Sequence, residues 1–192
     1  MGKGRLEAFS DGVFAIIITI MVLELKVPHG DAWADLMQLG PVFLSYVLSF
    51  TYVGVYWNNH HHMLHATKKV SAGILWGNLH LLFWLSLLPF TTGWMGENHF
   101  TSLPVAVYGF DLLMCGLSYV ILQTRIIKFH GDNSVLAKAV GHDFKGKLSF
   151  FTYLISIPVA LAGYPFIAVG LMFSIVILWI IPDRRIEKVL EV

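Results

Sequence analysis

A run of histidines is the strongest metal-binding signal in the chain. Residues 58–62 read Asn-Asn-His-His-His, and a further histidine stands at position 65. His61 and His65 are four residues apart, a spacing that places two imidazoles on one face of a helix, where they can bind a transition metal ion. A divalent-metal transporter that uses His61 and His65 is therefore one hypothesis for the function.

The same cluster also suits a packing role. No carboxylate and no cysteine stands beside these histidines in the sequence, although a zinc site usually takes three or four protein ligands. We therefore favour hydrogen bonds from His60 or His61 to Ser10 or Asp11, near the start of the chain. On this interpretation the protein holds no metal and no cofactor.

The composition sets the environment in which these side chains must work. Hydrophobic types make up 56% of the 192 residues and charged types 13%, whereas a soluble domain carries about 25% charged residues. This balance excludes both a water-facing domain and a disordered chain. A net charge of +1 provides no basic surface for a nucleic-acid partner, and the single Cys115 excludes a disulfide framework.

The hydrophobic residues gather into segments long enough to cross a bilayer, which takes roughly 20 apolar residues. Six such segments lie at 6–27, 36–63, 70–95, 103–127, 144–162 and 164–181. Pro158, Gly163 and Pro165 crowd the last junction, where one re-entrant element is the alternative. Acidic residues at the start of the first segment distinguish it from a cleaved signal peptide. We predict an all-α, multi-pass membrane protein with residues 1–192 as one unit.

The basic residues give the orientation. With six spans and both termini on one side, that side holds all of the 13 lysines and arginines except Lys26. The bias supports an even number of spans and predicts that both termini are cytoplasmic. A bundle this small has little interior to spare, so we expect an oligomer with any transport pathway between subunits.

Polar side chains at the start of the first span need an explanation, because charge at membrane depth is costly and usually functional. Arg5, Ser10 and Asp11 form the densest such group. The plain alternative is a helix start at the membrane surface, where Ser and Asp stabilise the positive end of the helix dipole.

Three further polar residues stand in or near the spans. We expect Asp111 and His80 each to form a hydrogen bond to a neighbouring helix. Glu24 lies at the other end of the first span, where it can attract cations to a pore mouth or pair with Lys26.

Arg5, followed after three residues by Phe9-Ser10-Asp11 and an isoleucine-rich helix, resembles the signature of the transmembrane-protein-175 family of potassium channels. These channels are lysosomal in animals and also occur in bacteria and archaea. The resemblance extends to other positions that look like the family's polar residues and helix ends: Trp57, His60, His61, Asn78 and 88–90. In length and span count the chain is similar to the prokaryotic members, which assemble as homotetramers around a central pore.

The resemblance implies that the first helix lines the pore. At about 100° per residue, Ile16, Ile20 and Leu23 lie on one face of that helix, with Thr19 beside them. Such a stripe is ordinarily core or lipid-facing. The family likeness instead implies that Ile16 forms the narrow constriction and that Thr19 is a matched position. Four copies of Ile16 would form an apolar ring that gates by dewetting.

The chain contains no Thr-Val-Gly-Tyr-Gly filter loop, so rings of backbone carbonyls cannot select the ion as in ordinary potassium channels. Thr19 is then the polar candidate on the stripe, and we expect modest selectivity for K⁺ over other monovalent cations. No phosphate-binding loop or nucleophile elbow indicates an enzyme. The leading hypothesis is a leak-like potassium channel in a prokaryotic inner membrane.

Overall fold

The computed structural model describes residues 2–141 and 143–180, and all secondary structure in these residues is helical. This confirms the predicted all-α architecture. The helices are α1 (Lys3–Leu23), α2 (Trp33–Met37), α3 (Gly40–His65), α4 (Ala72–Leu85), α5 (Leu88–Glu97), α6 (Ser102–His130), α7 (Val135–Val140), α8 (Phe144–Leu161) and α9 (Pro165–Ile180). The end of the sixth predicted span at 181 and three of the predicted cytoplasmic basic residues lie outside the described residues: Arg184, Arg185 and Lys188.

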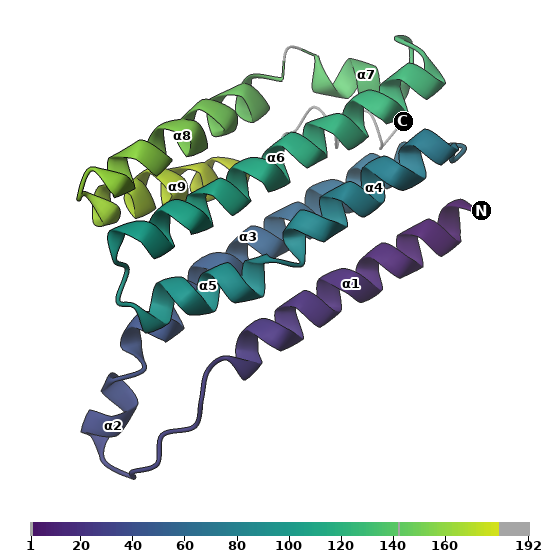
Figure 1. The fold of residues 1–192 in the computed structure, drawn as a ribbon. Helices are drawn as coiled ribbons and strands as arrows, with labels where there is room; N and C mark the ends of the chain where they lie inside the picture. Colours follow the sequence, from purple (N-terminus) through teal and green to yellow (C-terminus); the bar gives the residue numbers. More distant parts are fainter. Residues whose placement is uncertain (1, 142, 181–192) are drawn as a thin grey trace.

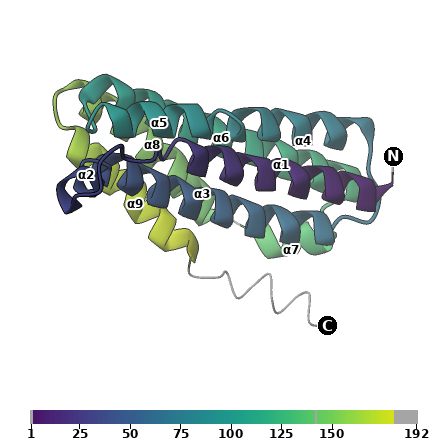
Figure 2. The ribbon, with the colours of Figure 1, turned by 90° about the horizontal axis from the view of Figure 1, so that it is seen from below.

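The long helices run up and down beside one another (Figure 1). α6 packs against α4 and α8, and α9 covers α8, while α3 packs against α5. α1 lies at the edge of this bundle and contacts α3, α4 and α5. Figure 2 shows α1 between α3 on one side and α4 with α5 on the other. Within the described residues, one face of α1 is therefore left without a neighbouring helix.

Several of the helices are suited to a bilayer by length and composition. In the described residues, three segments are long and apolar enough to cross it: Lys3–Leu23, Ala72–Glu97 and Ser102–His130. The shorter helix Pro165–Ile180 is also apolar. α3 has 26 residues, but its last turns carry the polar Asn and His run. The count of six spans stays a prediction.

Two prolines mark helix ends that hydropathy alone does not reveal. The third predicted span, 70–95, is interrupted between α4 and α5 at Ser86 and Leu87, because Pro89 has no N–H and its ring clashes with the carbonyl four residues earlier. That carbonyl belongs to Leu85, the last residue of α4. Pro165 stands in the same relation to Leu161, the last residue of α8.

The residues of the last two predicted spans form two helices joined by a short turn. α8 ends at Leu161 and α9 begins at Pro165, and Gly163 between them has φ of +95°. Such a left-handed backbone favours glycine because it has no Cβ. The turn reverses the chain, so that α9 packs back along α8.

Basic side chains gather at one end of the bundle. Lys3 Nζ donates to the carbonyl of His65 at 2.8 Å, and the backbone N–H of Lys69 donates to His130 Nε2 at 3.2 Å. The start of α1 therefore lies beside the ends of α3 and α6. Lys26, at the opposite end, pairs with Glu97 at 3.1 Å. A Glu24–Lys26 pair is therefore wrong, because α5 brings Glu97 closer to the lysine, and Glu24 lies against Gly93 instead.

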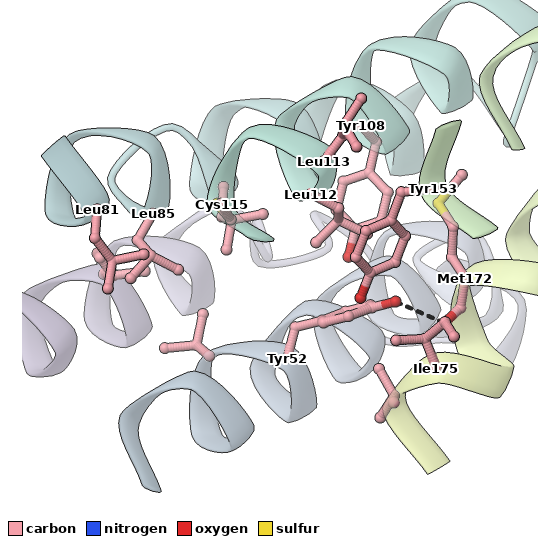
Figure 3. Close-up of a cluster of buried hydrophobic side chains, with 14 of the residues drawn as sticks. Tyr52, Leu81, Leu85, Tyr108, Leu112, Leu113, Cys115, Tyr153, Met172 and Ile175 are labelled. Carbon is pink, nitrogen blue, oxygen red and sulfur yellow. Dashed lines mark hydrogen bonds between the residues drawn. The ribbon is translucent and has the colours of Figure 1, made fainter. Parts of the chain in front are cut away.

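Tyrosines from three helices meet in the core. Tyr52 of α3 has its ring 6.4 Å from that of Tyr108 and 6.3 Å from that of Tyr153. Its hydroxyl donates to the carbonyl of Met172 in α9 at 2.6 Å, the bond dashed in Figure 3. Large aromatic rings fill the space between the helices, while this hydroxyl finds a partner as buried tyrosines require.

Close packing of α3 on α5 yields a first prediction. A Cβ on Gly96 would lie 2.8 Å from Val42 Cα and also collide with Ser45 Oγ. Gly96→Ala should therefore lower the free energy of unfolding by about 1–3 kcal/mol, because backbone atoms cannot move aside cheaply. The measurement is thermal unfolding in detergent. The control is Gly54→Ala, where no heavy atom lies within 4 Å. Equal unfolding temperatures for the two variants would contradict the close contact.

Candidate functional site

α1 has two distinct faces. One face packs inside the chain and its residues are buried: Leu6, Ser10, Phe14, Ile17 and Met21. The other face carries the stripe singled out in the sequence, together with Phe9, and it is exposed. Ile16 is 58% exposed, Ile20 43% and Leu23 72%, and Thr19 is exposed as well. The stripe is therefore not part of the core of the single chain.

A buried hydrogen-bond chain fixes the rotation of α1. Asn78 Nδ2 of α4 donates to Ser10 Oγ of α1 at 3.0 Å. His60 Nε2 of α3 lies 2.7 Å from Asn78 Oδ1. Because an amide oxygen only accepts, this histidine nitrogen must be the donor. All three side chains are at most 1% exposed, so three helices are joined by polar bonds away from water.

Ser10 Oγ completes the chain by donating to the carbonyl of Leu6 at 2.9 Å. The ring of Phe14, one turn further along α1, lies 5.5 Å from the His60 ring. The sequence predicts a hydrogen bond from His60 or His61 to Ser10 or Asp11, and in the structure His60 reaches Ser10 only through Asn78. The bridging place of Asn78 between the other two is the part that only the structure supplies.

Asp11 does not accept the expected hydrogen bond from His60 or His61. Its carboxylate is exposed and accepts a hydrogen bond from Trp57 Nε1 at 3.0 Å. Consecutive residues on a helix point about 100° apart, so only one of Ser10 and Asp11 can enter the bundle, and Ser10 does. Asp11 instead joins the outer edge of α1 to the outer edge of α3.

Arg5 and His61, two other residues that the family resemblance points to, lie outside this chain of bonds. Arg5 is exposed, and within the described residues its guanidinium has no hydrogen bond or ion pair. His61 is also exposed. Its ring lies 6.2 Å from the ring of Trp57 and stacks at 6.2 Å on the ring of His65. In a single chain, then, Arg5 and His61 do not reach Ser10 or Asn78.

The histidine pair can be assessed as a metal site. His61 and His65 share one face of α3, as their spacing predicts. Across the described parts of the chain, no group of three or more His, Cys, Asp or Glu side chains is placed to hold a metal ion. Since a zinc site takes at least three protein ligands, this pair would need further ligands from outside the described residues.

A second buried polar cluster lies deeper, between α3, α5 and α6. Thr92 Oγ1 donates to Ser49 Oγ at 2.7 Å, and Ser49 Oγ lies 2.9 Å from the hydroxyl of Tyr108. Thr91 Oγ1 donates to Asp111 Oδ2 at 3.0 Å. The predicted interhelical bond of Asp111 is therefore confirmed. Nothing in the sequence distinguishes these two threonines, because threonines are common in any membrane helix.

His80 does not form the expected hydrogen bond to a neighbouring helix. Its Nε2 accepts a hydrogen bond at 3.2 Å from Trp84 Nε1, on the same helix α4. An interhelical bond for His80 is therefore wrong. The four-residue spacing places the two rings on one face of the helix, and the nearest partner is within the helix itself.

Comparison with known proteins identifies the family. A potassium channel of Chryseobacterium sp. (strain P1-3) is 54% identical to this chain over 191 residues, covering 100% of this chain and 99% of that protein. The chain belongs to the TMEM175 family. The sequence profile described as "Endosomal/lysosomal potassium channel TMEM175" matches residues 5–89, which hold the stripe, Trp57, His60 and Asn78. The predicted family resemblance is confirmed.

The fold is shared with a TMEM175 protein of known structure. The crystal structure of a lysosomal potassium-selective channel TMEM175 homolog from Chamaesiphon minutus matches with a TM-score of 0.80 and 26% identity, covering 94% of this chain and 97% of that one. The human endosomal/lysosomal proton channel TMEM175 is 40% identical over 96 residues, which are 43% of this chain and 19% of the human one. The likeness to the human protein is thus confined to a part of each chain.

The buried chain of bonds gives a second prediction. Asn78→Leu keeps the side-chain size but leaves the His60 donor without its partner, which should cost about 1–3 kcal/mol of stability. Asn58→Leu is the control, because Asn58 is exposed on α3. Adding His60→Leu to Asn78→Leu should recover part of the loss, since both partners are then apolar. Thermal unfolding of the wild-type protein and the three variants measures these differences. Equal stability of the two asparagine variants would contradict the role of the hydrogen-bond chain.

Proposed function

We propose that this TMEM175 chain forms a potassium-permeable, leak-like cation channel, a homotetramer in which α1 of each copy lines a central pore. The observation that carries the proposal is the exposed face of α1. It presents Ile16, Ile20 and Leu23 with one hydroxyl, Thr19, on a helix whose opposite face is buried. The bacterial relative of 54% identity is named a potassium channel, which supports the choice of ion.

A lipid-facing role for the same stripe is less well supported. The exposed side of α1 also carries Gly4, Ala8 and Gly12, and a Cβ on either glycine would have no heavy atom within 4 Å. Small residues at four-residue spacing let helices of a membrane bundle approach closely. This half of α1 therefore suits contact with a neighbouring subunit, and the apolar half that follows suits the pore.

The proposed constriction is apolar. Four Ile16 side chains around one axis form a ring that gives an ion no replacement for its water, and such rings gate by dewetting. Ile20 and Leu23 add further apolar layers toward the far end of α1. Conduction then depends on how wide the ring stands, which the rotation of α1 controls.

Thr19 supplies the polar contact in this pore. Its hydroxyl donates to the carbonyl of Ala15 at 2.8 Å, so the oxygen lone pairs are left to face a cation. A few hydroxyl oxygens replace only part of a hydration shell. The pore therefore favours K⁺, which gives up its water more easily than Na⁺, but with modest selectivity.

The polar residues around α1 act as its support. The Ser10–Asn78–His60 chain holds one side of the helix, and the bond from Trp57 to Asp11 holds another. Basic residues at one end of the bundle support cytoplasmic termini, because basic loops stay inside. We place the protein in a prokaryotic inner membrane as six spans per subunit.

The constriction is tested by Ile16→Asn. An amide replaces part of an ion's hydration, so conductance should rise and the preference for K⁺ over Na⁺ should fall severalfold. The control is Ile155→Asn, which changes an exposed isoleucine of α8, far from the proposed pore. K⁺, Na⁺ and H⁺ fluxes are measured in liposomes at equal protein incorporation.

Identical fluxes for Ile16→Asn and Ile155→Asn would show that α1 does not line the pathway. A flux of Zn²⁺ or Ni²⁺ that is lost in the His61→Ala, His65→Ala protein would instead support the transporter. Proton flux without K⁺ flux would support the same pore with H⁺ rather than K⁺ as its permeant ion.

Thr19→Val tests selectivity separately from gating. Valine keeps the branched shape and removes the oxygen, so K⁺ over Na⁺ preference should fall by roughly threefold or more, with assembly unchanged, as expected for the loss of one ion contact. Thr51→Val is the matched control, because Thr51 Oγ1 makes the same bond to a carbonyl four residues earlier, at 2.8 Å. Bi-ionic flux measurements compare the two. If the Thr19→Val channel keeps the wild-type preference for K⁺ over Na⁺, the Thr19 hydroxyl does not contribute to selectivity.

A further inference from the structure

A large cavity lies between α3, α6, α8 and α9. Its volume is about 490 Å³, within the range of sites that hold small molecules. α1 contributes no residue to its lining, so it is separate from the proposed pore. Most of its wall is aromatic or aliphatic, with tyrosines and a tryptophan from all four helices: Tyr52, Tyr56, Tyr119, Tyr153 and Trp179.

Three polar groups of the inner wall are already paired within the protein. The hydroxyl of Tyr52 donates to the Met172 carbonyl at 2.6 Å. That of Tyr119 donates to the Asn59 carbonyl at 3.3 Å, and Trp179 Nε1 donates to Ser149 Oγ at 2.9 Å. The space therefore offers an occupant mainly apolar surface. Figure 3 shows Tyr52 and Tyr153, which line this cavity, pointing toward each other.

Three polar residues of the cavity lining lie at one end. Asn59, Asp143 and Lys147 line it near the end of α3 and the start of α8. Tyr52 stands seven residues before Asn59, so the apolar part reaches about 10 Å into the bundle at 1.5 Å per residue. The polar end is the basic end of the bundle, where Lys3 meets the end of α3. The cavity therefore has one polar end and one apolar end, as an amphiphilic ligand has.

The polar end carries one basic and one acidic side chain, Lys147 and Asp143. Within the described residues the ammonium of Lys147 has no ion pair or hydrogen bond. The Asp143 carboxylate beside it is engaged as the cap of α8, accepting from the Gly146 N–H at 3.1 Å. Because Asp143 is already bound to the start of α8, the Lys147 ammonium is the group at this end that can pair with a lipid phosphate.

We propose that this cavity binds a membrane phospholipid, with one acyl chain among the tyrosines and the phosphate beside Lys147. Val120 and Phe151 line the cavity and are also 38% and 57% exposed, so an acyl chain reaches it sideways from the bilayer. The headgroup then lies at the level of the basic residues, where lipid phosphates meet a membrane protein.

Gly116 allows the cavity to be filled. It lines the wall, and a Cβ there would meet only Tyr56 Oη at 3.8 Å and Tyr153 Cε2 at 3.9 Å. Gly116→Leu should therefore place its side chain in the space of the acyl chain. The matched control is Gly170→Leu, on the exposed side of α9, where a Cβ has nothing within 4 Å.

The full chain is incubated in detergent with palmitoyl-oleoyl phosphatidylglycerol, and bound lipid is counted by native mass spectrometry. Gly116→Leu should bind roughly tenfold more weakly than Gly170→Leu, the change that 1.4 kcal/mol produces. Equal binding by the two variants overturns the proposal.

The phosphate contact is tested with Lys147→Gln against Lys128→Gln, a lysine at the same end that does not line the cavity. Lys147→Gln should weaken binding of phosphatidylglycerol severalfold and leave diacylglycerol with the same chains unaffected. An equal loss for both lipids, or for neither, overturns the assignment of the headgroup.

If Gly116→Leu does not fold, the proposal is tested with the wild-type protein. It is loaded with phosphatidylglycerol brominated in its acyl chains, and bulk lipid is removed by gel filtration. Retained lipid should quench the emission that is lost in Trp179→Phe, because bromine quenches only nearby indoles. Unquenched Trp179 emission overturns the proposal.

Discussion

The rotation of α1 about its own axis is the constraint on which the proposed pore depends. A helix at the edge of a bundle has a choice of faces to bury, and apolar residues surround most of α1. The choice is made by a polar group, because Ser10 is buried with Asn78 and His60 at bonds of 2.7–3.0 Å. Rotating α1 by one residue would leave these groups unpaired away from water, which costs far more than exchanging one isoleucine for another.

The two polar links to α1 have different surroundings. The bonds through Asn78 are buried, so water does not compete for their donors and acceptors and each bond is stronger than it would be at the surface. The bond between Trp57 and Asp11 joins two exposed side chains at the rim where α1 meets α3. The buried chain thus sets the rotation of the helix, and the second bond joins α1 to α3 at their exposed edge.

Much of the fold could be read from the sequence because it follows from hydropathy and helical spacing. The predicted segments correspond to α1, α3, α4 with α5, α6, α8 and α9. The break before α5 was missed because hydropathy averages over a window, although Pro89 is itself a sufficient signal. The directions of Ser10 and Asp11 differ by one residue step, and only packing decides which of them turns inward.

The candidate site was predictable in its members but not in its bonds. The family signature pointed to Ser10, His60 and Asn78, yet their order along the chain of bonds depends on how α3 and α4 stand to α1. Trp57 as the partner of Asp11 likewise needs the distance between two helices. The cavity left no trace in the sequence, because an unfilled space depends on four helices at once and belongs to no single motif.

α3 is the wall shared by both proposed sites. Trp57 and His60 face α1, while Tyr52, Tyr56 and Asn59 line the cavity. Residues 56, 57, 59 and 60 alternate between the two sides, because neighbouring positions on a helix diverge by about 100°. A chain of packed atoms therefore leads from the cavity through α3 to the polar bonds that set α1. Packed helices transmit small displacements rather than absorb them, so whatever fills the cavity acts on the same helix that holds α1 in its rotation.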